Sequence, residues 1–281
     1  MRAYSERYQV ILFISFFVSV LMAFHSRQAL AETLRLGGSG STTTVAKMLA
    51  DAYTKKYPQD SVTVSPALGT PGGIKALNAK AVDIALASRS LNDAERASGL
   101  SEVEFARTPL VMAVAAANPL NDIGFAHLAR LYGANAIWPD GTRVRLVLRP
   151  RDDADSKIVS GFSAGMAKAM EAALARPGAL VAATDEDAIS AIQRLPGALG
   201  PTTLAQILID KRPLKALALE GKPPTVDAAR AGNYAYYKRH FLVINAAATP
   251  AAKRFIEFVQ SAEAALLLAA HGCWIDSRKG K

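Results

Sequence analysis

Three short segments of this 281-residue chain combine small residues with hydroxyl side chains just before a predicted helix or just after a predicted strand. They are 38–43 (Gly-Ser-Gly-Ser-Thr-Thr), 69–73 (Gly-Thr-Pro-Gly-Gly) and Ser88-Arg89. Glycine lets backbone N–H groups come close to a ligand, and Ser41, Thr42 and Thr70 add hydroxyl donors. Such donors can surround an oxyanion without a metal ion. We therefore expect an anion-binding site where the three segments meet.

Each segment also has a purely structural explanation. Ser41 or Thr42 can cap a helix, and Gly72-Gly73 can form a turn. Arg89 can form a structural salt bridge. Both interpretations stay open for each segment alone, and the three segments together favour a site.

The elements around these segments alternate between strand and helix. Leu34–Leu36, Ser61–Ser65 and Val82–Ala87 are predicted strands, and helical spacing follows from Val45 and again over Ile74–Ala79. This alternation predicts an α/β fold with a mostly parallel sheet flanked by helices. Ligands of such sheets bind outside the carboxyl ends of the strands, where helix N-termini favour anions.

Two breaks in the pattern suggest a division into two lobes. The apolar strand Leu110–Ala117 ends at Asn118-Pro119, and a second break lies between Ala231 and Tyr237. We expect residues 32–117 and 236–281 to form the first lobe and residues 118–235 to form an inserted second lobe. Because the chain crosses twice between such lobes, the crossings are expected to act as a hinge.

The second lobe and the C-terminal part are predicted to contain further helices and strands. The pattern predicts strands at Val144–Leu148, Leu214–Leu219 and Phe241–Ile244, and helices over Ala126–Tyr132, Ser156–Ala175, Ala188–Arg194 and Ala251–Ala270.

Charge and cysteine content narrow the classes of partner. The formal net charge is +9, which raises the local concentration of anions. Lysine and arginine are scattered along the chain, so we expect no nucleic-acid partner. Cys273 is the only cysteine and excludes an internal disulfide. Neither a cofactor nor a metal site is expected.

The first residues have the three-part arrangement of a secretory signal peptide. Arg2 and Arg7 precede an apolar run from Val10 to Phe24, and small residues end the segment at Ala31. The apolar run is shorter than the roughly 20 residues that a membrane-spanning helix needs. We therefore expect residues 1–31 to be cleaved, the mature chain to begin at Glu32, and the product to be periplasmic.

Several motifs taken together resemble the phosphate-binding proteins of ABC importers, within the periplasmic-binding-protein superfamily. The resemblance covers essentially the whole mature chain. It rests on segments 38–42 (Gly-Ser-Gly-Ser-Thr), 69–75 (Gly-Thr-Pro-Gly-Gly-Ile-Lys), 82–91 (Val-Asp-Ile-Ala-Leu-Ala-Ser-Arg-Ser-Leu) and 195–200 (Leu-Pro-Gly-Ala-Leu-Gly).

The resemblance implies a two-lobed periplasmic-binding fold that closes by a hinge on a small oxyanion, with phosphate as the expected ligand. It implies that Ser41, Thr42, Thr70 and Ser88 contact the ligand, with Arg89 following. It further implies an ABC permease in the inner membrane as partner, a monomeric binding protein and no enzymatic activity.

The second lobe departs from the family pattern. Arg149 or Arg151 can supply the expected arginine, and Ser156 the expected hydroxyl, but Asp153-Ala154-Asp155 replaces Gly-Ser-Gly. Two carboxylates near phosphate would repel it by about 4 kcal/mol per pair at 4 Å and an effective dielectric of about 20. The aspartates either cap the following helix, accept a proton of a protonated oxyanion, or indicate that this lobe binds something else.

Three alternative functions are compatible with parts of this sequence. An orphan or sensory protein for another anion, such as molybdate, sulfate or a small organic phosphate, would keep the same fold. A structural envelope protein is disfavoured, because strand-end clusters of glycine and hydroxyl side chains have no use there. Segment 161–165 (Gly-Phe-Ser-Ala-Gly) has the spacing of a hydrolase nucleophile elbow around Ser163, but a predicted helix surrounds it, which disfavours a serine hydrolase.

The histidines and one basic run have ordinary explanations. His127, His240 and His271 lack metal-ligand spacing. The run Lys238-Arg239-His240 is expected to be a solvated face of the hinge.

Overall fold

The computed structural model describes residues 33–275. The expected signal peptide, residues 1–31, and the expected mature start at Glu32 lie outside this range. In chain order the elements are β1 (Thr33–Gly38), α2 (Gly40–Lys56), β2 (Ser61–Val64), α3 (Gly69–Asn78), β3 (Ile84–Ala87), α4 (Asp93–Ala97), β4 (Leu100–Ala115), β5 (Asp122–Ile123), α5 (Phe125–Leu131), β6 (Arg145–Leu146), α6 (Ala154–Ser160), α7 (Ala164–Leu174), α8 (Asp185–Arg194), β7 (Ala198–Thr203), α9 (Leu204–Ile209), β8 (Leu214–Ala216), β9 (Ala218–Leu219), α10 (Val226–Arg230), β10 (Tyr237–Asn245), α11 (Pro250–Val259) and α12 (Ala262–Ala270).

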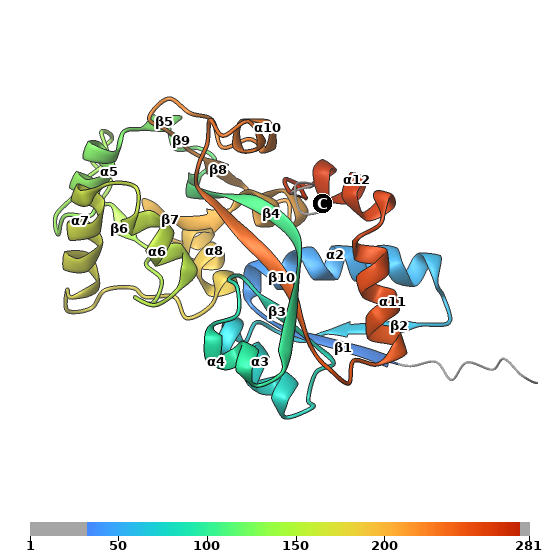
Figure 1. The fold of residues 1–281 in the computed structure, drawn as a ribbon. Coiled ribbons are helices and arrows are strands. Elements are labelled where there is room, and N and C mark those ends of the chain that lie inside the picture. The colour runs from blue at the N-terminus through green and yellow to red at the C-terminus, as the bar shows by residue number, and fades with distance from the viewer. Residues whose placement is uncertain (1–32, 276–281) are drawn as a thin grey trace, which may run out of the picture. The chain divides into compact units, whose positions relative to one another are not determined.

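The main sheet has the strand order β2-β1-β3-β10-β4-β7-β6, with β8 also paired to β4. The outer pairs β1–β2, β1–β3 and β6–β7 are parallel, whereas β10 is antiparallel to both β3 and β4. Figure 1 shows β4 and β10 running side by side through the middle of the molecule, with α2 and α11 at one end and α5 to α7 at the other. These two long strands therefore connect the two ends of the sheet.

Strand β4 begins ten residues before the predicted strand Leu110–Ala117. Its first part contains Glu102, Glu104 and Arg107, which break the apolar pattern that predicts a buried strand. In the structure Glu102 pairs with Arg96 and Glu104 pairs with Arg239, so these charges are neutralised where the strand is partly exposed. The pairing of Glu104 with Arg239, 135 residues away, is not visible in the local sequence, and the prediction missed this part of the strand.

Buried apolar residues form separate clusters at the two ends of the sheet. The amino-terminal cluster includes Leu36, Tyr53 and Phe255. The second cluster includes Tyr132 and Met166. Strand β4 contributes to both, since Phe105 belongs to the first cluster and Met112 to the second.

Two expected long helices are each divided in two. The stretch Ser156–Ala175 contains α6 and α7, and Ala251–Ala270 contains α11 and α12. In each case a serine caps the second helix: the Ser163 Oγ accepts from the Met166 N–H at 3.1 Å, and the Ser261 Oγ accepts from the Ala264 N–H at 3.3 Å. Side-chain capping of a new helix competes with continuation of the old one, and here it prevails.

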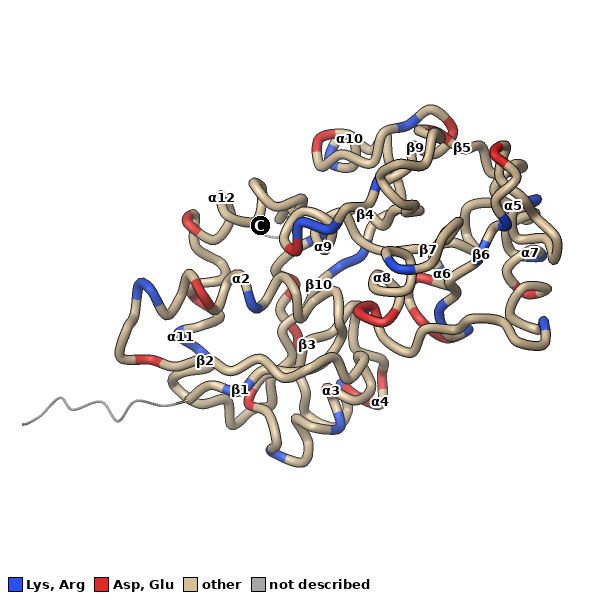
Figure 2. Tube along the Cα trace, turned by 180° about the vertical axis from the view of Figure 1, so that it is seen from behind, with Lys and Arg blue, Asp and Glu red and all other residues tan. Residues whose placement is uncertain are grey.

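Charged residues are spread over many elements (Figure 2). Between residues 33 and 275, no helix is long and apolar enough to cross a membrane. Within the same range, no group of three or more His, Cys, Asp or Glu side chains is arranged to hold a metal ion.

Candidate anion-binding site

The turn between β1 and α2 requires glycine because other backbone segments lie against it. A Cβ at Gly38 would lie 2.0 Å from the carbonyl oxygen of Leu86 on β3. A Cβ at Gly73 on α3 would lie 2.7 Å from the Cα of Gly38. Ser39, which follows Gly38, donates its N–H to the carbonyl oxygen of Leu86 at 2.8 Å. These contacts hold the N-terminus of α2 at the carboxyl ends of β1 and β3.

Ser41 and Thr42 lie in the first turn of α2 and are both fully buried. The Thr42 hydroxyl contacts the carbonyl oxygen of Ala87 at 3.2 Å and the Nδ1 of His240 at 2.8 Å. The Ser41 hydroxyl has no hydrogen-bond partner among the described residues. A buried hydroxyl without a partner is costly, so Ser41 is a donor available to a ligand.

Thr70 and Ser88 form a second pair of hydroxyls beside this turn. Their oxygens are 3.3 Å apart, and the Ser88 N–H donates to the Thr70 Oγ1 at 3.1 Å. Because Ser88 follows Ala87, which contacts Thr42, the structure brings together the hydroxyl residues of the three strand-end segments.

Arg89 is held by a neighbouring helix. Its guanidinium forms two hydrogen bonds of 2.8 Å to the carboxylate of Glu95 on α4. This is the structural salt bridge that the sequence left open as an alternative for Arg89.

Arg149, which follows β6, lies at the centre of a buried ionic cluster. Its guanidinium donates to the carbonyl oxygen of Ala182 at 2.7 Å and to Asp153 at 3.0 Å. Its Nε is 3.6 Å from the Oδ2 of Asp155, and its Nη2 is 3.5 Å from the Oδ2 of Asp185. Arg149 is only 2% exposed, and within the described part of the chain its Nε makes no hydrogen bond.

Lys238 completes this cluster from β10. Its Nζ lies 2.6 Å from the Oδ1 of Asp155 and 2.5 Å from the Oδ1 of Asp185. The expectation that Lys238, Arg239 and His240 form a solvated face was wrong for two of them, because Lys238 and His240 are buried. Residues two apart on a strand share a face, and in β10 that face packs on the N-terminus of α2.

The cluster contains two cations and three carboxylates. Burial raises the pKa of Asp155 to about 6, with repulsion from Asp185 adding to the effect and attraction by Lys238 opposing it. Burial acts in the same direction on Asp185, but attraction by Lys238 and Arg149 and a hydrogen bond from the backbone N–H of Ser41 outweigh it. The pKa of Asp185 therefore falls below its usual range, and this carboxylate is charged.

The Asp185 carboxylate lies against the first residue of α2. A Cβ at Gly40 would lie 3.0 Å from the Cβ of Asp185 and 3.2 Å from its Oδ2. Asp185 thus meets the N-terminus of α2, Lys238 and Arg149 together. We call this place the α2 site: the N–H and hydroxyl of Ser41, the Arg149 guanidinium and the Lys238 ammonium.

Two other candidates of the second lobe, Arg151 and Ser156, direct their side chains to other partners. Arg151 is exposed and pairs with Glu171. The Ser156 hydroxyl donates to the backbone oxygen of Arg149 at 2.9 Å, so it fixes the position of that arginine. Asp153 caps α6 by accepting from the N–H of Asp155 at 2.9 Å, whereas the Asp155 side chain points at Lys238.

Asp185, Lys238 and His240 were missed from the sequence. The run 184–187 (Thr-Asp-Glu-Asp) has the composition of a helix start, and Thr184 and Asp187 do form a capping box there. Alternation along β10 was the available signal for Lys238 and His240, since both lie on the face opposite Arg239. Their partners come from other elements, so the sequence offered no reason to bury them.

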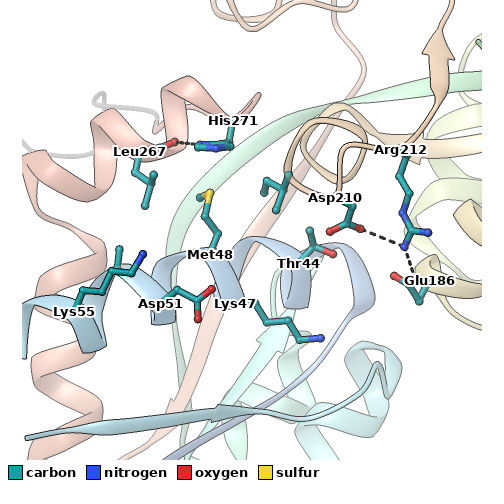
Figure 3. Close-up of a pocket in the computed structure, with 12 residues that line it drawn as sticks. Thr44, Lys47, Met48, Asp51, Lys55, Glu186, Asp210, Arg212, Leu267 and His271 are labelled. Carbon is teal, nitrogen blue, oxygen red and sulfur yellow. Dashed lines mark hydrogen bonds and ion pairs between the residues drawn. The ribbon is translucent and has the colours of Figure 1, made fainter. Parts of the chain in front are cut away.

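A separate cavity of about 570 Å³ lies along the middle of α2, between that helix and α12 (Figure 3). Its lining contains both basic and acidic side chains, namely Lys47, Lys55 and Arg212 together with Asp51, Glu186 and Asp210. Arg212 contacts Glu186 at 2.6 Å and Asp210 at 3.4 Å. The charges of this cavity are thus balanced, and Arg212 is already paired with two carboxylates.

Comparison with known proteins places the chain among binding proteins. A family model for the PBP superfamily domain matches residues 25–263. Protein SphX of Synechococcus elongatus is 30% identical over 137 residues, which are 47% of this chain and 40% of SphX. The match to this curated relative thus spans less than half of that protein.

Two solved structures are similar over most of the chain. A protein described as a phosphate ABC transporter substrate-binding protein from Clostridium perfringens, solved with bound phosphate, has a TM-score of 0.73 and 21% identity over 88% of this chain and 100% of its own. An ABC-type phosphate transport receptor from Vibrio cholerae has a TM-score of 0.58 and 21% identity over 86% of this chain and 100% of its own. These likenesses confirm the expected two-lobed α/β fold.

Proposed function

The chain belongs to the PBP superfamily, and from this premise we propose that it is a solute-binding protein that captures a small oxyanion for an ABC importer. Phosphate is the proposed ligand. The proposal includes a periplasmic location and no enzymatic activity.

One observation carries the proposal: the α2 site already holds an oxyanion group of the chain itself. The Asp185 carboxylate is bound there by Lys238 and lies within 3.5 Å of Arg149. A phosphate ion presents the same kind of oxygen to the same donors. The buried Ser41 hydroxyl and the Arg149 Nε, which make no hydrogen bond to the described residues, are two further donors for a tetrahedral ligand.

Among oxyanions we favour phosphate, because two proteins of similar fold are described as phosphate-binding or phosphate-transport proteins. The Clostridium perfringens structure contains bound phosphate, and the Vibrio cholerae protein is a phosphate transport receptor. Both share only the fold at their level of identity. The choice of ligand therefore rests on the match between their named ligand and the donors of the α2 site.

The proposed release mechanism uses the two crossings of the chain. We place the hinge at the two crossings of the chain, one along β4 and the residues up to about 117 and the other near residue 236, just before β10. Opening there separates Ser41 on α2 from Arg149 after β6, so the ligand would lose donors from one side. A membrane permease that holds the open form would therefore release the ligand.

The position of Ser163 at the start of a helix is an argument against hydrolase activity. It accepts a hydrogen bond from the Met166 N–H as the cap of α7, and the element before it is helix α6. A nucleophile elbow instead follows a strand.

Isothermal titration calorimetry tests the proposal directly. The protein is stripped of ligand by unfolding and refolding, then titrated with phosphate, sulfate and molybdate. We expect phosphate to bind with micromolar or tighter affinity, and Ser41→Ala to bind it at least tenfold more weakly because a donor to the ligand is lost. If phosphate gives no heat with the wild-type protein, phosphate is not its ligand.

A further inference from the structure

The Asp185 carboxylate occupies the place where an anion would meet the strongest donors of the α2 site. It contacts Lys238 at 2.5 Å, lies 3.5 Å from the Nη2 of Arg149 and touches the first residue of α2. Both cations are buried, Lys238 at 1% exposure and Arg149 at 2%. An incoming anion therefore has to share or take over donors that already serve a carboxylate.

Charge balance makes this sharing unfavourable. With all groups ionised, Asp153, Asp155 and Asp185 outnumber Arg149 and Lys238 by one. The cluster thus has no surplus positive charge to compensate a bound anion. Moving the anion in while Asp185 stays would leave buried negative charges close together, which is strongly unfavourable in a medium of low polarity.

From this geometry we propose that Asp185 is an intramolecular competitor of the ligand, and thereby the residue that sets the affinity of the α2 site for anions. The carboxylate must leave Lys238 and Arg149 before an external oxyanion can bind them. This inference rests on the proposed function, because it concerns the same site and an oxyanion ligand.

Asp185 also connects helix α8 with the N-terminus of α2 and with strand β10. Asp185 is the first residue of α8, and its contacts reach the N-terminus of α2 and strand β10. Helix α8 packs against β7 and β4, whereas the start of α2 lies at the ends of β1 and β3. The carboxylate therefore holds α8 against α2 in the absence of a ligand.

The test is a titration of inorganic phosphate into wild-type protein, Asp185→Asn and the control Glu186→Gln. Asparagine keeps the shape of aspartate but removes the charge, so its hold on Lys238 and Arg149 is weaker. Glu186 is the next residue and pairs with Arg212 on the surface, so its replacement makes the same charge change outside the α2 site. We expect Asp185→Asn to bind phosphate at least tenfold more tightly than wild type, and Glu186→Gln to bind as wild type does.

The outcomes separate this inference from the proposed function. If wild type binds phosphate and Asp185→Asn binds it equally or more weakly, Asp185 is not a competitor, while the proposed function stands. If neither protein binds phosphate, both proposals are overturned for this ligand. If only Asp185→Asn binds phosphate, the competition is confirmed and phosphate is not the ligand of the wild-type protein. Thermal melting checks that each variant is folded, and Asp185→Ser, which also suits a helix start, replaces the asparagine variant if that one does not fold.

Discussion

Ser41 and Thr42 are neighbours on α2, yet their hydroxyls have different roles. The Thr42 hydroxyl is engaged by His240 and by the carbonyl oxygen of Ala87, whereas the Ser41 hydroxyl has no partner in the described part of the chain. A hydroxyl that already serves the protein contributes to stability. A free one is available to the ligand. The two residues were equivalent candidates in the sequence, and only their contacts separate them.

We expect Thr42→Val to destabilise the protein by about 1–3 kcal/mol, because it leaves the buried Nδ1 of His240 without a partner. Ser41→Ala is the matched control one residue away and removes no internal hydrogen bond. Urea unfolding monitored by circular dichroism measures both. Equal stability of the two variants would contradict the role assigned to Thr42.

The raised pKa of Asp155 predicts that the free energy of unfolding depends on pH. Burial raises its pKa to about 6 in the folded chain, above the value of about 4 of an unfolded aspartate. Between these values the folded state holds a proton that the unfolded state has lost. The contribution of Asp155 is therefore present at low pH and is lost as the pH rises through 6.

Asp155→Asn cannot titrate and removes this dependence. We expect the unfolding free energy of wild type, relative to that of the variant, to fall by on the order of 2 kcal/mol between pH 4.5 and pH 7.5. His240 acts in the opposite direction, because burial lowers its pKa to about 3, but it is present in both proteins. A difference that is constant over this range, measured by urea unfolding, would show that Asp155 is ionised throughout.

At the scale of elements, the close approach of α3 to β1 determines where the α2 site can form. Helix α3 begins at Gly69, so the glycines that were predicted to form a turn before it are part of the helix. At Gly73 the backbone of Gly37 and Gly38 fills the place of a side chain. Helical glycine is unfavourable by about 1 kcal/mol relative to alanine, and here the contact with β1 compensates for it.

We expect Gly73→Ala to destabilise the protein by about 1–3 kcal/mol, because its Cβ would lie 2.7 Å from the Gly38 Cα and one of the two backbones has to move. Gly165→Ala is the control in helix α7, where the nearest atom to the new Cβ is the Ser163 Oγ at 3.6 Å. Alanine there is expected to be neutral or stabilising. Thermal melting of both variants checks the contrast.

At the scale of the whole molecule, the ionic cluster connects elements from both ends of the sheet. Arg149 and Asp155 come from the end with β6 and α6, Lys238 comes from the crossing strand β10, and Asp185 reaches α2. Contacts of this kind favour a closed arrangement even without a ligand. We therefore expect a bound anion to change the shape of the wild-type protein little.

We expect the unliganded Asp185→Asn variant to have a larger radius of gyration than unliganded wild type, because it lacks the charged contact between α8 and Lys238. Phosphate is expected to restore the smaller radius in the variant. Small-angle X-ray scattering measures both states, with Glu186→Gln as the control. Identical radii for unliganded wild type and Asp185→Asn would show that this contact does not hold the closed form.

Local patterns in the sequence determined the fold class and pointed to Ser41 of the α2 site. Alternating apolar runs and glycine-rich turns predicted β1, α2, β2 and β3, because those signals depend on near neighbours in the chain. The same signals placed Ser41 and Thr42 at a helix start. They did not locate all of β4, since Glu104 in its first part pairs with the distant Arg239.

Only the tertiary structure decided which charged groups meet. It buried Arg149 and exposed Arg151, although only Pro150 separates them, and it brought Asp185 and Lys238 to the N-terminus of α2. A charge is stable inside a protein only beside its partner. Because Asp185 and Lys238 are 53 residues apart in the chain, their burial followed from the fold and not from any local pattern.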